Sequence, residues 1–237
     1  MTVQLTSCNW LTCPQPKPKA QLRLFCFPCA GATAPAYRIW ANKLPPEVEI
    51  YLVQLPGRGS RLNEQPFTKL SDLVQTLVPI LQPHLNIPFA FFGHSLGALL
   101  SFEIARQLRR QNFSIPVHLF VCCSPAPQKP NLDSPIHALP TTAFLTQLRD
   151  RYNGIPLLIS RDRELMQLFL PSLRADLEML ETYFYTPEKP LDCSISAFGG
   201  WQDLAIGSCD LAEWRDQTCN SFSLQMFPGD HFFLHNN

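Results

Sequence analysis

Phe89-Ala90-Phe91-Phe92-Gly93-His94-Ser95-Leu96-Gly97-Ala98-Leu99-Leu100 is the most informative segment of this sequence. Residues 89–92 form a short apolar run that ends at a glycine, which is typical of a strand buried on both faces. Apolar side chains then recur at helical spacing over residues 96–108. The segment therefore predicts a strand and a helix that are joined by a sharp turn at Ser95.

The turn at Ser95 has the pattern G-x-S-x-G, with Gly93 and Gly97 two residues away on either side. A sharp strand-to-helix turn lifts one hydroxyl above the edge of a sheet and crowds its neighbours, so glycines are needed at these positions. The start of the helix also favours the negative charge that develops when the hydroxyl reacts. Ser95 is thus the candidate nucleophile, and His94 is interpreted as a packing residue of the turn.

Five further apolar runs predict strands on either side of this unit. Each run is short and has a glycine or proline close to its end; the runs cover residues 22–27, 48–55, 117–123, 193–198 and 222–227. Helical patterns lie between several of them. Strands that alternate with helices predict an α/β fold, in which a mostly parallel sheet is flanked by helices.

One long insertion interrupts this alternation, because residues 139–185 carry helical periodicity without a strand signal. The apolar face of one helix is expected to hold Leu173, Leu177, Leu180 and Phe184. The water-exposed face is expected to hold Arg174, Asp176, Glu178 and Glu181. We predict a helical lid at about residues 139–186, over the carboxyl edge of the sheet.

Composition narrows the function classes. Hydrophobic residues make up 46% and charged residues 16% of the chain, so it can bury a large core. Its formal net charge is zero, which argues against nucleic acid or an anionic membrane as partner. No apolar run is long enough for a membrane span, and the first twenty residues lack the pattern of a secretory signal. We expect a cytoplasmic monomer.

The nine cysteines are scattered and include no C-x-x-C pair. Without a secretory signal, reduced thiols are the default. The spacing expected of zinc ligands is also missing. We therefore predict no metal site, and we interpret most of the cysteines as small core residues.

The general base is sought among the histidines that follow Ser95. His231 comes just after the last predicted strand, where a loop can bring its imidazole to the nucleophile, and His235 is the alternative. Asp203 follows the fifth strand and is the preferred acid, because the chain order Ser95, Asp203, His231 is that of the α/β-hydrolase fold. Two other carboxylates remain possible acids, Asp210 and Asp133. Asp210 is equally suited to capping a helix.

An oxyanion hole needs two backbone N–H groups that point at the reacting carbonyl oxygen. One is expected from Leu96, the residue after the nucleophile. The other is expected from the loop after the first strand, where Ala30 is the first choice and Cys29 the second. Small residues there suit a close approach of backbone to substrate. Cys29 is not expected to be a nucleophile, because no strand-to-helix turn presents it.

The predicted domain organisation is simple. Residues 1–20, with prolines at every second position from 14 to 18, are expected to form an extended N-terminal leader. Residues 21–237 are expected to form one α/β-hydrolase domain, with the helical lid as an insertion.

Several segments together resemble the stand-alone, or type II, thioesterases of nonribosomal peptide and polyketide synthases. The elbow is shared with many hydrolases, but Q-L-P-G-R, L-R-A-D and P-G-D-H-F-F are more specific. The matching segments are residues 27–31, 54–58, 88–100, 170–176, 199–203 and 227–233. They span nearly the whole chain. Two departures are Ala32, where the family usually has a glycine, and an end six residues after His231, where the family usually continues through a helix.

The resemblance implies hydrolysis of acyl groups from the 4'-phosphopantetheine arm of acyl or peptidyl carrier protein domains, which would be the partners. It implies the triad Ser95, Asp203 and His231, a helical lid, and no cofactor of the enzyme's own. Two other hypotheses stay open at this point. One is a general esterase or lipase that acts on oxygen esters, and the other is an inactive module that only binds carrier proteins.

Overall fold

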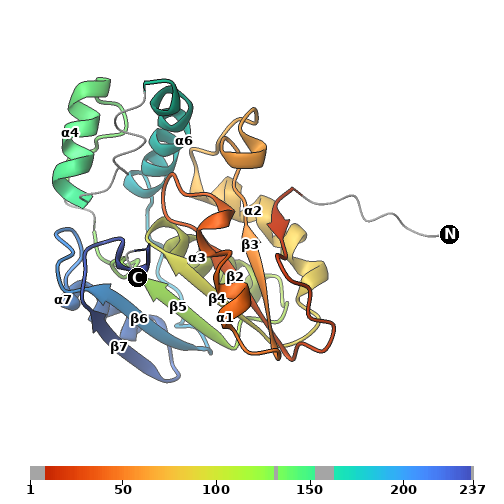
Figure 1. Cartoon of the computed structure of the whole chain (residues 1–237). Helices are drawn as coiled ribbons and strands as arrows, with labels where there is room; N and C mark the ends of the chain where they lie inside the picture. Colours follow the sequence, from red (N-terminus) through yellow and green to blue (C-terminus); the bar gives the residue numbers. More distant parts are fainter. Residues whose placement is uncertain (1–8, 131–132, 153–162, 236–237) are drawn as a thin grey trace.

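Seven strands form one sheet in the order β1-β3-β2-β4-β5-β6-β7 (Figure 1). They are seen in a computed structural model that describes residues 9–130, 133–152 and 163–235. Every neighbouring pair is parallel except β1 and β3. The strands are β1 Leu11–Thr12, β2 Leu22–Phe27, β3 Val48–Val53, β4 Phe89–His94, β5 His118–Cys122, β6 Ser194–Gly200 and β7 Phe222–Phe227.

All six strands predicted from apolar runs are present, and β2 and β7 have the predicted bounds. The mostly parallel sheet flanked by helices is confirmed. The leader differs from its prediction, because Leu11 and Thr12 pair with Val53 and Leu52 as an antiparallel edge strand. Trp10, next to this strand, packs against the core. This part of the predicted leader thus belongs to the sheet.

The helices are α1 Trp40–Lys43, α2 Leu70–Leu81, α3 Leu96–Arg110, α4 Thr141–Tyr152, α6 Arg163–Glu181 and α7 Ser208–Ala212. Short 3-10 turns lie at η1 Ala34–Tyr37, η2 Gly59–Arg61, η3 Gln82–His84, η4 Glu213–Gln217 and η5 Phe233–His235. None of the helices in the described ranges is both long and apolar enough to cross a lipid bilayer.

Two hydrophobic layers cover the sheet, one on each face. Phe25 and Phe27 of β2 face the layer that contains α2, α3 and Trp214. Leu24 and Cys26 of the same strand face the layer that contains η1, α1 and Phe233. Successive side chains of a strand point to opposite faces, so an uninterrupted apolar strand can serve both layers.

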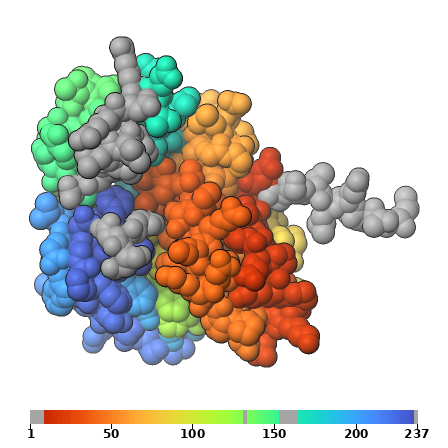
Figure 2. All heavy atoms as spheres, in the orientation of Figure 1, coloured from red at the N-terminus to blue at the C-terminus, as the bar shows by residue number. Residues whose placement is uncertain are grey.

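The insertion between β5 and β6 contains α4 and α6, which lie on the side of the sheet toward which the parallel strands point (Figure 1). In the space-filling view they gather at one end of the molecule (Figure 2). They share a small core of their own, formed by Ile136, Phe144, Leu148, Leu173 and Leu177. Ala30, from the loop after β2, packs against this core. The two helices therefore lie directly over the loop that was predicted to supply an oxyanion-hole amide.

Two predictions for α6 are wrong. The helix ends at Glu181, so Phe184 lies beyond it, and its side chain is 85% exposed. Asp176 was expected on the water-exposed face, but it is fully buried. Leu173 and Leu177 are buried as predicted.

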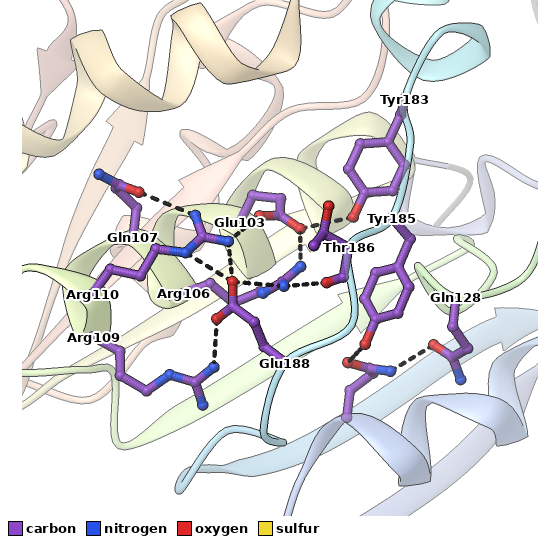
Figure 3. A network of polar contacts seen from close by, with 11 residues as sticks. Glu103, Arg106, Gln107, Arg109, Arg110, Gln128, Tyr183, Tyr185, Thr186 and Glu188 are labelled. Atoms are coloured by element: carbon purple, nitrogen blue, oxygen red, sulfur yellow. Dashed lines mark hydrogen bonds and ion pairs between the residues drawn. The ribbon is translucent and has the colours of Figure 1, made fainter.

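The chain that leaves α6 is anchored to α3 (Figure 3). The Tyr183 hydroxyl donates to Glu103 at 2.7 Å, and Glu188 accepts from Arg109 and Arg110 at 2.9 and 2.8 Å. Burial raises the pKa of the Glu188 carboxyl, but the hydrogen bonds from these arginines outweigh it and lower the pKa to about 2. The segment that returns from α6 to the sheet is thus held by charge pairs at neutral pH.

Candidate active site

Ser95 lies at the turn between β4 and α3. Its backbone has φ 53° and ψ −114°, a conformation that residues other than glycine rarely adopt. Its N–H donates to the Cys122 carbonyl at 2.8 Å, which fixes the turn to the end of β5. A Cβ added to Gly93 would lie 2.2 Å from the Gly97 oxygen. One added to Gly97 would lie 2.1 Å from the Phe27 oxygen. Main chain fills the space on both sides of Ser95, as the G-x-S-x-G pattern predicts.

The close approach of Gly97 to Phe27 also brings the loop after β2 to the start of α3. Leu96 is the first residue of α3, so its N–H has no acceptor one turn earlier in the helix. In the opposite loop, the N–H of Gly31 is already used, since it donates to Asp176 Oδ2 at 2.7 Å. The neighbouring Ala30 N–H remains our choice for the second oxyanion-hole donor.

Asp203 and His231 lie side by side, although they are 28 residues apart in sequence. His231 Nδ1 is 2.8 Å from Asp203 Oδ2, and both side chains are almost completely buried. The other carboxylate oxygen, Oδ1, accepts from the backbone N–H groups of Ala205 and Ile206 at 2.9 and 3.2 Å. The carboxylate is therefore oriented from two sides.

Burial by itself raises the pKa of the Asp203 carboxyl. The hydrogen bond and charge of His231, with the hydrogen bonds from Ala205 and Ile206, outweigh it and leave the pKa below its usual value. Asp203 is thus ionised at neutral pH and can hold the Nδ1–H of the imidazole. That tautomer leaves Nε2 free to accept a proton.

The loops that carry these two residues are held together by their main chains. Gln202 N–H donates to the Gly229 carbonyl at 2.9 Å, and Trp201 N–H donates to the Phe227 carbonyl at 2.8 Å. A Cβ on Gly200 would lie 2.3 Å from the Gly229 oxygen, so only glycine permits this approach. The relative position of acid and base therefore depends on backbone contacts as well as on the side-chain hydrogen bond.

His94 connects His231 to the turn that carries Ser95. Its Nε2 lies 2.8 Å from the His231 carbonyl oxygen, and the two imidazole rings are 5.4 Å apart. His94 is completely buried, in agreement with its predicted packing role. Within the described ranges, no hydrogen bond joins the Ser95 hydroxyl to His231, so that contact stays a prediction.

The alternative acids have other partners. Asp210 accepts from the Gly207 N–H at 2.8 Å, which caps α7, and it pairs with Lys129. Asp133 lies 3.7 Å from Arg151. Asp203, in contrast, lies within hydrogen-bonding distance of His231, so it remains the preferred candidate for the acid.

The remaining histidines lie elsewhere. His118 faces Ser196 at 2.9 Å, His137 faces Glu181 at 2.5 Å, and the His84 ring packs against Tyr51. His235 ends η5, and its side chain lies outside the described part of the structure.

Three buried cysteines surround the site. Cys122 and Cys123 lie near His94, and Cys123 also lies near Asp203 and His231, in groupings that resemble metal-ligand sets. Burial raises the pKa of the Cys122 thiol well above its usual value, as does its hydrogen bond to Cys123. Burial, with the charge of Asp176, likewise raises the pKa of Cys29 to about 12. Nucleophilic attack needs a thiolate, so the raised pKa values of Cys122 and Cys29 favour packing roles for these two side chains.

Comparison with known proteins identifies the family. Residues 22–237 match the family described as Thioesterase domain. The chain belongs to the thioesterase family. The resemblance noted in the sequence is confirmed, and so is the α/β-hydrolase fold.

Relatives of this thioesterase come from biosynthetic pathways and biosynthetic clusters. It is 44% identical to the gramicidin S biosynthesis protein GrsT of Aneurinibacillus migulanus, over 96% of this chain and 88% of GrsT. RedJ, a thioesterase from the prodiginine biosynthetic pathway in Streptomyces coelicolor, superimposes with a TM-score of 0.88 at 39% identity, over 94% of this chain and 87% of RedJ. The type II thioesterase BorB from the borrelidin biosynthetic cluster has a TM-score of 0.86 at 33% identity, over 96% and 92% of the two chains.

Helices α4 and α6 contact the candidate site through residues that the sequence analysis did not assign to that site. The Tyr152 ring, at the end of α4, lies 5.2 Å from the His231 ring. Phe169 of α6 lies so close to Gly31 that an added Cβ would be 2.5 Å from its ring. Asp176 of α6 pairs with Arg58. The only sequence signal for this last pair was its presence in the Q-L-P-G-R and L-R-A-D segments.

The acid can be tested by a shape-preserving substitution. We expect Asp203→Asn to lower kcat on a thioester about 10⁴-fold, because the amide has no charge to hold the Nδ1–H of His231 and stabilise the imidazolium. Asp210→Asn is the matched control, since it alters a helix cap and a surface ion pair and should change kcat little. Steady-state hydrolysis of both variants gives the ranking. The reverse ranking would move the acid to the other loop.

Proposed function

We propose that Ser95, His231 and Asp203 form the catalytic triad of an enzyme that hydrolyses acyl thioesters carried on the phosphopantetheine arm of carrier protein domains. The observation that carries this proposal is the hydrogen bond between Asp203 and His231, whose main chain contacts His94, the residue before a serine in a strained strand-to-helix turn. Membership of the thioesterase family gives the reaction class. The partner is inferred from relatives such as BorB, a type II thioesterase of a biosynthetic cluster.

The first half of the reaction acylates the enzyme. Ser95 Oγ attacks the thioester carbonyl carbon while His231 Nε2 takes the hydroxyl proton. The Ala30 and Leu96 N–H groups hold the oxygen that becomes negative, and the dipole of α3 adds to this stabilisation. The C–S bond then breaks, and the imidazolium protonates the departing thiolate. A thiol leaves more readily than an alcohol because its pKa, about 8.5, is far lower.

The second half releases the acid. Water enters the place of the thiol, His231 takes one of its protons, and the oxygen attacks the acyl-Ser95 carbonyl. The same two N–H groups hold the second oxyanion. When the C–Oγ bond breaks, Ser95 regains its proton from His231, and the carboxylic acid leaves. No redox step and no cofactor of the enzyme's own enters this sequence.

The lid is the proposed boundary of the acyl site. We assign the hydrolase domain to residues 21–237 and the lid to about residues 139–186. Its core packs on Ala30, and its Tyr152 ring packs on His231, so an acyl chain bound at Ser95 has lid side chains as neighbours.

The substrate class is tested by a paired comparison. We expect a short acyl group on a carrier protein to be hydrolysed with a higher kcat/KM than the same acyl group on N-acetylcysteamine, because docking adds binding energy remote from the carbonyl. General esterase activity is measured with the corresponding oxygen ester, in which an oxygen atom replaces the sulfur of the N-acetylcysteamine thioester. Equal kcat/KM values for the carrier-bound thioester and the N-acetylcysteamine thioester would show that the carrier protein contributes nothing to recognition. Faster hydrolysis of the oxygen ester would favour a general esterase instead.

A further inference from the structure

Asp176 is a fully buried carboxylate in the middle of the lid helix α6. Its Oδ1 accepts from Arg58 Nη2 at 2.7 Å, and its Oδ2 accepts from Arg58 Nη1. The same Oδ2 accepts from the backbone N–H of Gly31 at 2.7 Å. One carboxylate thus joins the lid to two loops of the hydrolase core.

Gly31 directly follows Ala30, whose N–H we assign to the oxyanion hole. Gly31 has φ +73°, and Phe169 and Leu173 fill the space where a side chain would lie. Its N–H belongs to the peptide unit that joins it to Ala30, so a hydrogen bond to this N–H fixes the plane of that unit. This unit adjoins the Ala30 Cα, so an acceptor supplied by α6 fixes the main chain directly beside the peptide unit that carries the Ala30 N–H.

Arg58 is itself held in place. It is 4% exposed, its Nε donates to the Pro56 carbonyl, and its carbonyl accepts from Gln54 Nε2 at 3.1 Å. Gln54 Oε1 accepts from the Ala34 N–H at 2.9 Å, in the same loop after β2. A planar guanidinium that binds both carboxylate oxygens permits one orientation of Asp176. The arginine therefore orients the acceptor, and the acceptor orients the loop.

We propose that Asp176 and Arg58 are positioning residues of the oxyanion hole, which acquires its catalytic geometry only when α6 is seated on the core. The proposal rests on the function proposed above. Neither side chain touches the substrate. Catalysis gains because a preorganised N–H stabilises the oxyanion without reorganisation during the reaction. Packing of α6 on the core would therefore stabilise the transition state. This effect is separate from any effect of the lid on binding of the acyl group.

Two double variants separate positioning from mere stability. Arg58→Met with Asp176→Leu removes the acceptor for Gly31 and replaces the ion pair by apolar side chains, a change that proteins often tolerate without loss of stability. Arg58→Gln with Asp176→Asn removes both charges but retains an amide oxygen as acceptor. If the apolar pair does not fold, Arg58→Gln with Asp176→Ser takes its place, because the serine hydroxyl is too short to reach Gly31.

Two reactions are measured on each purified full chain, beside its thermal unfolding. One is hydrolysis of an N-acetylcysteamine thioester. The other is inactivation by a serine-directed phosphonate, whose developing P–O⁻ also needs the oxyanion hole. We expect the apolar pair to lose about 10²-fold in kcat and in inactivation rate with little change in KM, and the amide pair to recover most of that loss.

A second buried ion pair provides the control. Arg23 of β2 and Glu49 of β3 are largely buried and bonded at 3.1 Å. They lie near the start of their parallel strands, at the opposite edge of the sheet from Ser95. Arg23→Met with Glu49→Leu removes a comparable ion pair and should leave both rates near those of the unaltered chain.

The outcomes distinguish this proposal from the proposed function. Two results would overturn the positioning role. One is a folded variant without an acceptor for Gly31 that reacts as fast as the unaltered chain, and the other is an equal loss of rate in that variant and in the amide pair. A chain that reacts with the phosphonate but hydrolyses no thioester would overturn the proposed substrate class. The phosphonate rates would still decide whether Asp176 and Arg58 position the hole.

Discussion

Ser95→Ala is expected to abolish both thioester hydrolysis and covalent labelling by a serine-directed phosphonate. The substitution removes the atom that attacks the carbonyl, and no neighbouring group can replace it, since Cys29 is a buried thiol whose pKa is raised to about 12. Loss of a triad nucleophile lowers kcat by about 10⁶-fold in enzymes of this type. What remains is the small contribution of binding and of the oxyanion hole.

Mass spectrometry of the labelled chain measures this prediction directly. Ser101→Ala is the matched control, because Ser101 lies in α3, the helix that begins directly after Ser95, and its hydroxyl donates to the Ala98 carbonyl. The control should be labelled at Ser95 at a normal rate. Label on the Ser95→Ala chain at another serine, with turnover preserved, would show that the nucleophile has been misassigned.

His231→Ala is expected to lower kcat by a factor on the order of 10⁴ or more. Without the imidazole, Ser95 has no group to accept its proton, and the departing thiolate has no proton donor. The charged Asp203 would also lose its partner in a buried site, so unfolding should be followed beside activity. The loss should appear in kcat rather than in KM.

Two histidine variants control for this substitution. His118→Ala removes a ring that faces Ser196 on the sheet, away from the candidate triad. His235→Ala removes the alternative base that the sequence left open. Both should stay active. An active His231→Ala beside an inactive His235→Ala would transfer the role of base to His235.

The strands were predictable because their signals are local. Residues 22–27 and 222–227 are apolar runs bounded by proline, and they became β2 and β7 without a change of bounds. The edge strand Leu11–Thr12 was missed, because two residues cannot show a period and their pairing is decided by the exposed edge of β3. Helix ends were also uncertain: α6 stops before Phe184, which the apolar spacing had included.

The candidate triad could be inferred from position along the chain. In a parallel sheet the carboxyl ends of the strands meet at one edge, so residues after β4, β6 and β7 are brought together whatever their separation in sequence. Sequence alone left the choice between Asp203 and Asp210 open. The hydrogen bond between Asp203 and His231 supports Asp203, whereas Asp210 caps α7.

The burial of Asp176 could not be inferred in this way. Helical periodicity places it among polar residues, and a carboxylate is buried only when a partner compensates its charge. That partner, Arg58, is 118 residues away in sequence, and the third group, the Gly31 N–H, is main chain that every residue but proline carries. Local sequence patterns contain no information on contacts between segments so far apart in the sequence.

The long excursion between β5 and β6 has a consequence for how such enzymes diversify. Cys122 ends one strand and Ser194 begins its neighbour, so the ladder between them closes a loop of about 70 residues. The entropy of closing a loop grows only with the logarithm of its length, and doubling it costs about 0.6 kcal/mol. Insertions, deletions or exchanged segments between β5 and β6 therefore change the free energy of closing this loop very little. Selection can remodel the helical insertion while the strands that precede Ser95, Asp203 and His231 keep their register.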